Sequence, residues 1–396
     1  MADITLLATA DWDHPLWTNK QHVACSLAEL GHRILYVESL GLRSPRKSAS
    51  SSRSLAALSD HGRIWRRLRH GLRSPRQVRP GLWVWSPLVL PGAHRGLPLR
   101  VNRLLLGLGL SIWRRVLGLR ADWLWTYNPL TLAVLDPSPW KRLIYHCVDA
   151  IQSQPGMPAQ RITEGEEALC RRSDLVFVTS PGLLDRLRRF NAHTYFHPNV
   201  ADQAHFAQAM GGVLAVPDDL ASIPRPRLGF VGAISAYKLD LILLEELARS
   251  HPEWSIVLIG PVGEGDPETD ISALRSLSNV HLLGSRPYAD LPAYLKGFDL
   301  GLLPLRLNDY TQAMFPMKFF EYLAAGLPAV ATAIQSLQPF SSLALLVEPR
   351  PEAFAAAIEA ALAGRGPDLQ ERLRGAAEQT YRRRTEAMVQ HLARMA

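Results

Sequence analysis

The sequence predicts an α/β protein built of two Rossmann-like domains that face a cleft. Its 396 residues are too many for one hydrophobic core and fit two domains of about 150–200 residues each. Short apolar runs alternate with amphipathic stretches throughout, which is typical of β-α-β units and a mostly parallel sheet. A second alternating series begins after the Pro-rich segment Ile223–Arg227. In two such sheets we expect ligands to bind beyond the carboxyl ends of the strands.

The first series predicts an N-terminal domain over residues 1–200. The stretch Lys20–Leu30 has apolar residues at helical spacing and ends at Gly31. Ser44–Ser54 is rich in serine and predicts a loop, whereas Arg63–Arg79 is rich in arginine and places its apolar residues near helical spacing. The strands expected here are Ile4–Ala10, Arg33–Glu38, Leu82–Ser86, Trp123–Tyr127, Leu143–Cys147 and Leu175–Thr179.

The second series predicts a C-terminal domain over residues 225–368, joined to the first by a linker at 201–224. Residues 369–396 are helical in pattern and charged, and we expect this segment to pack back on the N-terminal domain. The expected strands are Leu228–Val231, Ile256–Ile259, Val280–Leu283, Leu300–Leu303, Ala329–Ala331 and Leu345–Val347. The expected helices are Leu239–Ser250, Ala289–Lys296, Lys318–Ala325 and Glu352–Ala363.

Charge is unevenly distributed along the chain. Residues 1–130 hold 19 Lys and Arg against 7 Asp and Glu, and the remaining residues hold 25 against 29. A half this basic indicates an anionic partner, although a merely soluble, arginine-rich surface would give the same count. Because no nucleic-acid-binding motif accompanies it, we expect no nucleic acid partner. A lipid surface or a phosphorylated ligand remains as the expected anionic partner.

The three cysteines and the apolar runs indicate in which cellular compartment the protein works. Cys25, Cys147 and Cys170 are widely spaced, without a CxxC pair, which disfavours a disulfide scaffold or a zinc site and fits a reducing, cytoplasmic setting. No His and carboxylate pattern predicts a metal centre. The longest apolar run, Leu104–Trp113, is too short to span a bilayer, and the first residues read as a strand.

Three successive strands of the C-terminal domain end in glycine, at Gly232, Gly260 and Gly284. Glycine after a strand lets backbone approach a phosphate, although strand-to-helix turns need glycine in any case. Lys238 follows the first of these loops and is a candidate phosphate contact. These residues predict a site where backbone meets a phosphorylated ligand.

The segment Pro316–Thr332 (PMKFFEYLAAGLPAVAT) carries the strongest signal. Lys318 and Glu321 are three residues apart and share one face near the start of a short helix. There a lysine can meet a diphosphate as a point charge, and a glutamate can accept hydrogen bonds from two ribose hydroxyls. A plain surface ion pair is the alternative.

This segment closely resembles the donor-binding segment of GT-B glycosyltransferases, namely the retaining family 4 and related bacterial exopolysaccharide and teichuronic-acid enzymes. The order GFVGAI, SIVLIGP, NVHLLGSRPYADLPAYLKGFDLGLLPL and then KFFEYLAAGLPAVAT matches over about 120 residues, and more loosely at YHCVDA, DLVFVTS and FHPNVAD. The resemblance implies a GT-B fold, a UDP- or GDP-sugar as donor substrate in the rear domain, no bound cofactor, and an acceptor in the front domain. Met317, Lys318 and Glu321 then bind the nucleotide.

One position departs from the family pattern. Many members carry two glutamates eight positions apart; Glu321 matches the second, but the first falls on Ala313. Neighbouring polar residues, Tyr310 among them, are candidate substitutes. The sugar and the stereochemistry therefore stay open, and the fit is better to a subgroup that uses Met-Lys with a single glutamate.

The N-terminal half supplies the candidate base and acceptor site. Asp149 ends the strand Leu143–Val148 and suits a general base that deprotonates an acceptor hydroxyl, although it also suits a helix cap. His14 is a second candidate base. Aromatic and polar groups of the same loop suit a sugar acceptor, notably Trp17 and Asn19, whereas His22 is expected to pack.

A basic, tryptophan-containing region predicts a membrane surface. Arg63–Arg79, Trp83, Trp85 and Leu104–Arg120 combine arginine, tryptophan and leucine, which suits an anionic headgroup layer. We therefore expect a cytoplasmic, peripheral protein at the inner face of the cell membrane.

Taken with the resemblance, these features predict a glycosyltransferase of hexosyl or glycuronosyl type. It would move a sugar from a nucleoside-diphosphate-sugar to a hydroxyl of a glycan or lipid-diphosphate-linked acceptor in cell-envelope or exopolysaccharide synthesis. A GT-B sugar-nucleotide epimerase is one alternative, which the basic, aromatic first half disfavours because an epimerase needs no acceptor site. A non-catalytic sugar-nucleotide-binding protein is the other, left open by Ala313.

Overall fold

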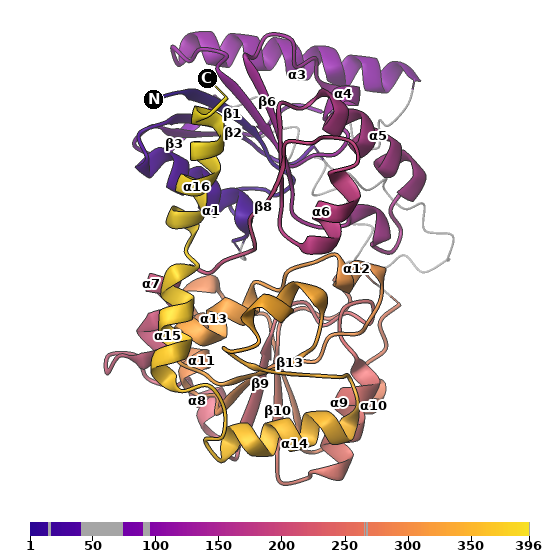
Figure 1. Cartoon of the computed structure of the whole chain (residues 1–396), viewed down its shortest axis with the longest axis vertical. Helices are drawn as coiled ribbons and strands as arrows, with labels where there is room; N and C mark the ends of the chain where they lie inside the picture. Colours follow the sequence, from indigo (N-terminus) through magenta and orange to yellow (C-terminus); the bar gives the residue numbers. More distant parts are fainter. Residues whose placement is uncertain (15–16, 41–73, 90–95, 265, 267, 396) are drawn as a thin grey trace.

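The protein consists of two α/β domains stacked along its long axis, as Figure 1 shows for the computed structural model. Residues 1–14, 17–40, 74–89, 96–264, 266 and 268–395 are described. Each domain is built on one sheet, which confirms the predicted fold class. The expected loop Ser44–Ser54 and the first part of the arginine-rich segment, residues 63–73, lie outside the described residues.

The N-terminal sheet has the strand order β3-β4-β2-β1-β5-β6-β7-β8, and only the β3–β4 pair is antiparallel. The strands are β1 Asp3–Leu7, β2 Arg33–Val37, β3 Arg76–Arg79, β4 Leu82–Trp85, β5 Trp123–Thr126, β6 Arg142–Cys147, β7 Leu175–Val178 and β8 Thr194–Phe196. Six of them were expected from apolar runs. The sequence missed β3 and β8 because both are edge strands with partly exposed side chains, so neither has a buried apolar run.

Five helices accompany the described part of this sheet: α1 Asn19–Glu29, α3 Gly96–Val116, α4 Thr131–Val134, α5 Ala159–Arg172 and α6 Pro181–Leu187. Two core clusters, one on each side of the sheet, hold its apolar side chains. Trp85 is 3% exposed within one cluster, so the expectation that it belongs to a membrane-facing surface is wrong, whereas Trp83 packs against the same cluster and stays half-buried.

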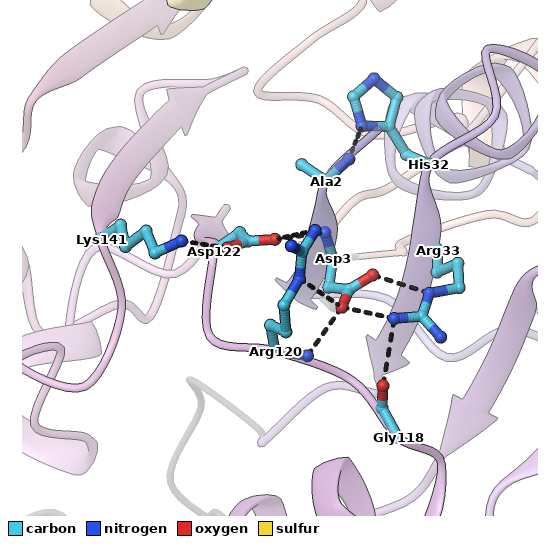
Figure 2. A network of polar contacts seen from close by, with 8 residues as sticks. All are labelled: Ala2, Asp3, His32, Arg33, Gly118, Arg120, Asp122 and Lys141. Carbon is cyan, nitrogen blue, oxygen red and sulfur yellow. Dashed lines mark hydrogen bonds and ion pairs between the residues drawn. The ribbon is translucent and has the colours of Figure 1, made fainter. Parts of the chain in front are cut away.

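A polar network closes the sheet at the amino ends of its strands (Figure 2). Asp3 on β1 is fully buried and accepts hydrogen bonds from the Arg33 side chain, at 2.6 and 2.7 Å, and from the Arg120 backbone N–H, at 2.7 Å. Asp122 accepts from the Asp3 N–H and pairs with Lys141. Burial by itself would raise the pKa of Asp3, but the bonds from Arg33 and Arg120 outweigh it and lower that pKa.

The C-terminal sheet is fully parallel, in the order β11-β10-β9-β12-β13-β14. Its strands are β9 Arg227–Val231, β10 Ser255–Ile259, β11 Val280–Gly284, β12 Leu300–Leu303, β13 Ala329–Thr332 and β14 Leu345–Val347. Its helices are α9 Leu241–Ser250, α10 Ser272–Arg275, α11 Leu291–Lys296, α12 Asp309–Gln312, α13 Lys318–Ala324 and α14 Pro351–Leu362. Every strand expected here is present: the four central strands are buried apolar runs, and the edge strands β11 and β14 are apolar runs whose side chains are partly buried.

The chain passes between the domains twice, side by side. Residues 201–224 form α7 Gln203–Phe206 and α8 Asp218–Ala221, whose Phe206 and Leu220 are buried in the C-terminal core. At the other end, α15 Leu369–Glu378 packs on the C-terminal domain and α16 Tyr381–Ala393 packs on α1. A β-bridge between Ala201 and Thr380 joins the two crossings (Figure 1).

Candidate functional site

A cleft of about 450 Å³ lies between the two domains. The N-terminal domain contributes side chains from the loop after β1 and from the segment after β6. The C-terminal domain contributes the loops after β9, β10 and β11 and the start of α13. The lining includes six residues on which the argument depends: His14, Trp17, Gly232, Lys238, Met317 and Lys318. The carboxyl ends of β9 and β10 therefore meet the cleft, as expected for a parallel sheet.

Two glycines shape the C-terminal wall of the cleft. Gly232 has φ +155° and Gly260 has φ +147°, a backbone conformation that favours glycine. A Cβ on Gly260 would lie 1.9 Å from the carbonyl oxygen of Gly232, so no side chain fits there. The Gly260 N–H in turn donates to the carbonyl of Gly284 at 3.0 Å. Three loops thus stack backbone on backbone and expose main chain rather than side chains to a ligand.

Lys238 stands beside this wall between two aromatic rings. Its Nζ lies 5.2 Å from the ring centroid of Tyr237 and 5.7 Å from that of Tyr310, both within cation–π range. The two tyrosine rings meet edge to face at 5.1 Å. The rings hold the ammonium group at the cleft, where it can meet an anion.

Asp149 follows β6 and meets the C-terminal domain. Its carboxylate accepts a hydrogen bond from the hydroxyl of Tyr310, which also bonds Gln154 of the cleft wall. Burial raises the pKa of Asp149, while the charges of Lys20 and Lys238 and the bond from Tyr310 pull it down without cancelling the rise. A carboxyl with a raised pKa is a stronger base than an ordinary surface carboxylate, which suits proton abstraction.

Lys20 is a functional candidate that sequence reasoning missed. It lies at the start of α1 over the ring of Tyr127, at 5.8 Å from the centroid, and interacts electrostatically with Asp149. Burial lowers the pKa of Lys20, and the charge of Asp149 opposes that change. More than a hundred residues separate the two in the chain, so no local pattern could have paired them.

Lys318 and Glu321 meet as predicted for one helix face. The Lys318 Nζ lies 2.5 Å from the Glu321 Oε2, and the side chains are only 19% and 5% exposed. The pair is therefore buried rather than a plain surface ion pair. Lys318 lines the cleft, whereas Glu321 lies behind it and is not among the lining residues.

Met317 and Asn19 lie where the two domains join. Asn19 is 3% exposed, and its side chain bonds Asn199 and the guanidinium of Arg384 on α16. The Met317 sulfur contacts the Asn19 amide at 4.0 Å and the Tyr381 hydroxyl at 3.5 Å. In this arrangement Asn19 holds α1, α16 and α13 together and presents no polar atom to an acceptor.

The loop after β1 brings His14 and Trp17 to the cleft. Trp17 packs edge to face on Trp12 at 5.2 Å and on His22 at 5.4 Å, which orients its ring. His22 itself is buried and stacks on Tyr381 at 4.2 Å. Burial, with the nearby charge of Arg384, lowers the pKa of His22 to about 3, so it packs as a neutral ring.

Ala313 faces the N-terminal domain instead of the cleft. Its carbonyl accepts a hydrogen bond from the Ser180 hydroxyl at 2.8 Å, and its Cα would lie 3.7 Å from a Cβ on Gly182. Its side chain packs against the N-terminal core. Residue 313 therefore contacts the N-terminal domain and is not among the residues that line the cleft.

Arg286 also lines the cleft and was not singled out from the sequence. Its guanidinium pairs with Asp219 at 2.6 Å and bonds the Tyr294 hydroxyl at 2.6 Å. It follows Gly284 just as Lys238 follows Gly232, so the same rule of a basic residue after a strand-ending glycine would have found it.

Two kinds of feature are absent from the described residues. They contain no group of three or more His, Cys, Asp or Glu side chains able to hold a metal ion. Within the same ranges, no helix is both long and apolar enough to cross a membrane.

Comparison with known proteins identifies the C-terminal domain. Residues 225–364 match the family "Glycosyl transferases group 1". The chain is 38% identical over 110 residues to the putative teichuronic acid biosynthesis glycosyltransferase TuaH of Bacillus subtilis (strain 168), a match that covers 28% of this chain and 27% of that relative. The chain thus spans only about a quarter of the length of the curated relative it matches.

Solved structures match along nearly the whole chain. Sucrose-phosphate synthase from Thermosynechococcus elongatus aligns with a TM-score of 0.70 and 17% identity, over 100% of this chain and 99% of that one. Anabaena HepE, in complex with UDP and glucose, aligns with a TM-score of 0.64 and 14% identity, over 99% and 100%. The fold is GT-B, and the resemblance to GT-B glycosyltransferases is confirmed.

Proposed function

We propose that this chain is a glycosyltransferase that moves a sugar from a nucleoside-diphosphate-sugar to a hydroxyl of an acceptor. The observation that carries the proposal is the cleft itself. Glycine loops, Lys238 and Lys318 form its C-terminal wall, and Asp149 meets this wall from the opposite domain. A phosphate-binding surface facing a carboxylate base is the arrangement that group transfer to a hydroxyl requires.

The donor diphosphate would lie along the C-terminal wall. The glycine loops after β9 and β10 let the diphosphate lie close to the main chain, and Lys238 and Lys318 supply positive charge to its oxygens. Glu321 would accept from the ribose once Lys318 turns from it to the diphosphate. A bound donor would therefore break the Lys318–Glu321 ion pair, because Lys318 would contact its diphosphate and Glu321 its ribose.

Transfer would proceed across the cleft. The acceptor oxygen forms a bond to the anomeric carbon, the bond from that carbon to the diphosphate oxygen breaks, and the hydroxyl proton passes to Asp149. The leaving nucleoside diphosphate carries the electron pair, and Lys238 and Lys318 stabilise its added charge. His14, at the mouth of the cleft, is the second candidate base, and the Trp17 ring offers an apolar face to the acceptor sugar.

The proposed donor carries UDP or GDP, and the proposed acceptor is a glycan or lipid-linked sugar of the cell envelope. The UDP complex of Anabaena HepE supports a UDP-type donor, and the similarity to the putative teichuronic acid enzyme supports an envelope or exopolysaccharide acceptor. We place the protein in the cytoplasm, peripheral to the inner face of the membrane, on the strength of its basic N-terminal half.

A nucleotide-sugar panel tests the proposal. The full chain is first screened by thermal shift, where a donor at a hundred times its Kd adds about 2.7 kcal/mol to the free energy of unfolding. Donors that bind are then incubated with and without cell-envelope lipid extract. Product that depends on the extract is the expected result. Interconversion of the donor without acceptor would mean an epimerase, and binding without turnover would mean a sensor; either outcome overturns the proposal.

A further inference from the structure

Helix α3 presents a continuous apolar row to solvent. It runs across the end of the N-terminal domain that is farthest from the C-terminal domain (Figure 1). Five of the thirteen exposed large apolar side chains among the described residues lie on it, each 53 to 73% exposed: Leu97, Leu104, Leu108, Ile112 and Val116. The last four are spaced by four residues, which puts them on one face of a helix with about 3.6 residues per turn. The other exposed apolar side chains are scattered over other elements.

The opposite face of α3 packs against the N-terminal core, so the orientation of its outward face is fixed. Leu106 and Leu110 are each 1% exposed in the core. At Gly109 a Cβ would lie 2.4 Å from the Trp85 ring, so the helix backbone rests directly on that indole. Beyond its last turn, the Gly118 carbonyl accepts from Arg33 at 3.0 Å within the Asp3 network (Figure 2). The helix cannot roll its apolar row inward without breaking these contacts.

Arginines border the apolar row, and their charge is offset only in part, since Arg103 interacts with the nearby carboxylate of Asp136. The helix contains Arg100, Arg103, Arg114 and Arg115 and no Asp or Glu. Arg100, Arg103 and Arg115 are exposed, while Arg114 lies over the Trp140 ring at 4.8 Å. Arginine stems can lie along apolar surface while their guanidinium groups reach phosphate. A row of leucine and isoleucine edged with arginine matches the boundary between acyl chains and anionic headgroups.

A second copy of this chain is a poorer partner for the same face. A two-fold pair would bring the arginines of one α3 close to those of the other, and like charges across an interface are unfavourable. An acidic, apolar surface of another protein would complement the charge of the α3 arginines. However, the four side chains Leu104, Leu108, Ile112 and Val116 form a row along a single helix and do not line the cavity beside the start of α3, so they offer a bilayer a continuous surface without a pocket for one partner side chain.

We propose that the outward face of α3 docks the protein on an anionic lipid bilayer. Docking would bring the enzyme to a lipid-linked acceptor, and this role rests on the proposed glycosyltransferase function. Because α3 lies at the far end of the N-terminal domain, the bound protein stands with its C-terminal domain away from the bilayer (Figure 1). The cleft, which lies between the two domains, is then held off the bilayer by the N-terminal domain, on the side where nucleotide-sugar is dissolved.

Vesicle flotation of the full chain tests the docking. The wild type is expected to float with phosphatidylcholine vesicles that contain phosphatidylglycerol at low salt, and with pure phosphatidylcholine far less. The Leu104→Gln/Leu108→Gln variant should partition at least about tenfold less, because burying two leucines drives insertion. The Arg100→Gln/Arg103→Gln variant should lose roughly fivefold per arginine. Ile242→Gln, which alters a 69% exposed isoleucine on α9, is the matched control and should float as the wild type does.

Three outcomes would overturn the docking proposal. They are a wild type that stays unbound, an L104Q/L108Q variant that floats equally well, and a wild-type dimer in sedimentation that this variant abolishes. Melting curves confirm that each variant is folded. Thermal shift by UDP and GDP, measured without lipid, reports the donor site separately. Lost flotation with an intact nucleotide shift overturns the docking only, and intact flotation without any nucleotide shift overturns the proposed function only.

Discussion

The hydroxyl of Tyr310 donates a hydrogen bond to the carboxylate of Asp149, and this bond joins the two domains beside the cleft. Tyr310 is 5% exposed and Asp149 is half-buried, and burial raises the pKa of each. The bond orients the carboxylate of Asp149 and stabilises its negative charge in part. If Asp149 is the base that we propose, the C-terminal domain orients a catalytic group of the N-terminal domain.

Asp149→Asn is expected to lower kcat by about 10² to 10⁴-fold, the range for loss of a general base. Its melting temperature should not fall, because the raised pKa means that the fold disfavours the charged carboxylate relative to water. Turnover and thermal melting of purified protein measure both. Tyr310→Phe keeps the ring and removes only the aiming bond, so its loss should be smaller. Near-normal turnover by a natively folded Asp149→Asn protein would exclude the role.

The acid limb of kcat/KM should report the titration of Asp149. Burial raises its pKa above the ordinary 3.8, so activity is expected to fall as the pH drops through that raised value. Lys20→Met removes a positive charge that holds the pKa down, so the limb should move to higher pH. Lys141→Met is the control, because this 72% exposed lysine pairs with Asp122 at the opposite edge of the sheet. An unmoved limb in Lys20→Met would contradict the pairing.

The Lys318–Glu321 pair should respond asymmetrically to mutation. Lys318→Met leaves a 4% exposed carboxylate without its cation and is expected to cost about 3 kcal/mol of unfolding free energy. Glu321→Gln should cost less, since the lysine can turn into the cleft. The double variant should regain most of the stability yet bind donor at least about tenfold more weakly. Urea unfolding of the single and double variants measures this, and strictly additive losses would mean that the pair does not interact.

Gly260→Ala should disrupt the C-terminal wall of the cleft. The new Cβ would lie 1.9 Å from the Gly232 carbonyl oxygen, at a φ of +147° that alanine rarely adopts. We expect a loss of roughly 1–3 kcal/mol in unfolding free energy, together with weaker nucleotide binding. Urea unfolding and nucleotide thermal shift measure the two effects. Gly212→Ala is the matched control, because a Cβ there meets nothing within 4 Å.

Acidification should destabilise the protein in part through His22. Its pKa is about 3 in the fold and about 6.5 in the unfolded chain, so the unfolded chain binds more protons between these values. Stability from the neutral ring is present above pH 6.5 and is lost progressively as the pH falls toward 3, by up to about 1.4 kcal/mol per pH unit. His22→Phe keeps a ring to stack on Tyr381 and should flatten this slope. Urea unfolding at several pH values decides; an unchanged slope would show that His22 does not titrate as described.

Much of the fold could be predicted because each buried strand is a local apolar run. The strands of the C-terminal domain were all expected, and the short helix Lys318–Ala324 with its Gly326 turn was read correctly. Those signals depend on a few neighbouring residues and on fixed backbone periodicity. The edge strand Arg76–Arg79 was missed because its pairing satisfies the backbone without burying its side chains.

The sequence by itself determined the two-sheet architecture, the glycines at the strand ends and the lysine and glutamate of the short helix. Only the tertiary structure decided which of these groups meet. In the folded protein, Lys20 and Tyr310 lie beside Asp149, and Glu321 lies behind Lys318. Asn19 is enclosed by three helices, and Ala313 packs on α6. The reason is that contacts between residues far apart in the chain depend on how two complete cores pack together, and no local pattern carries that information.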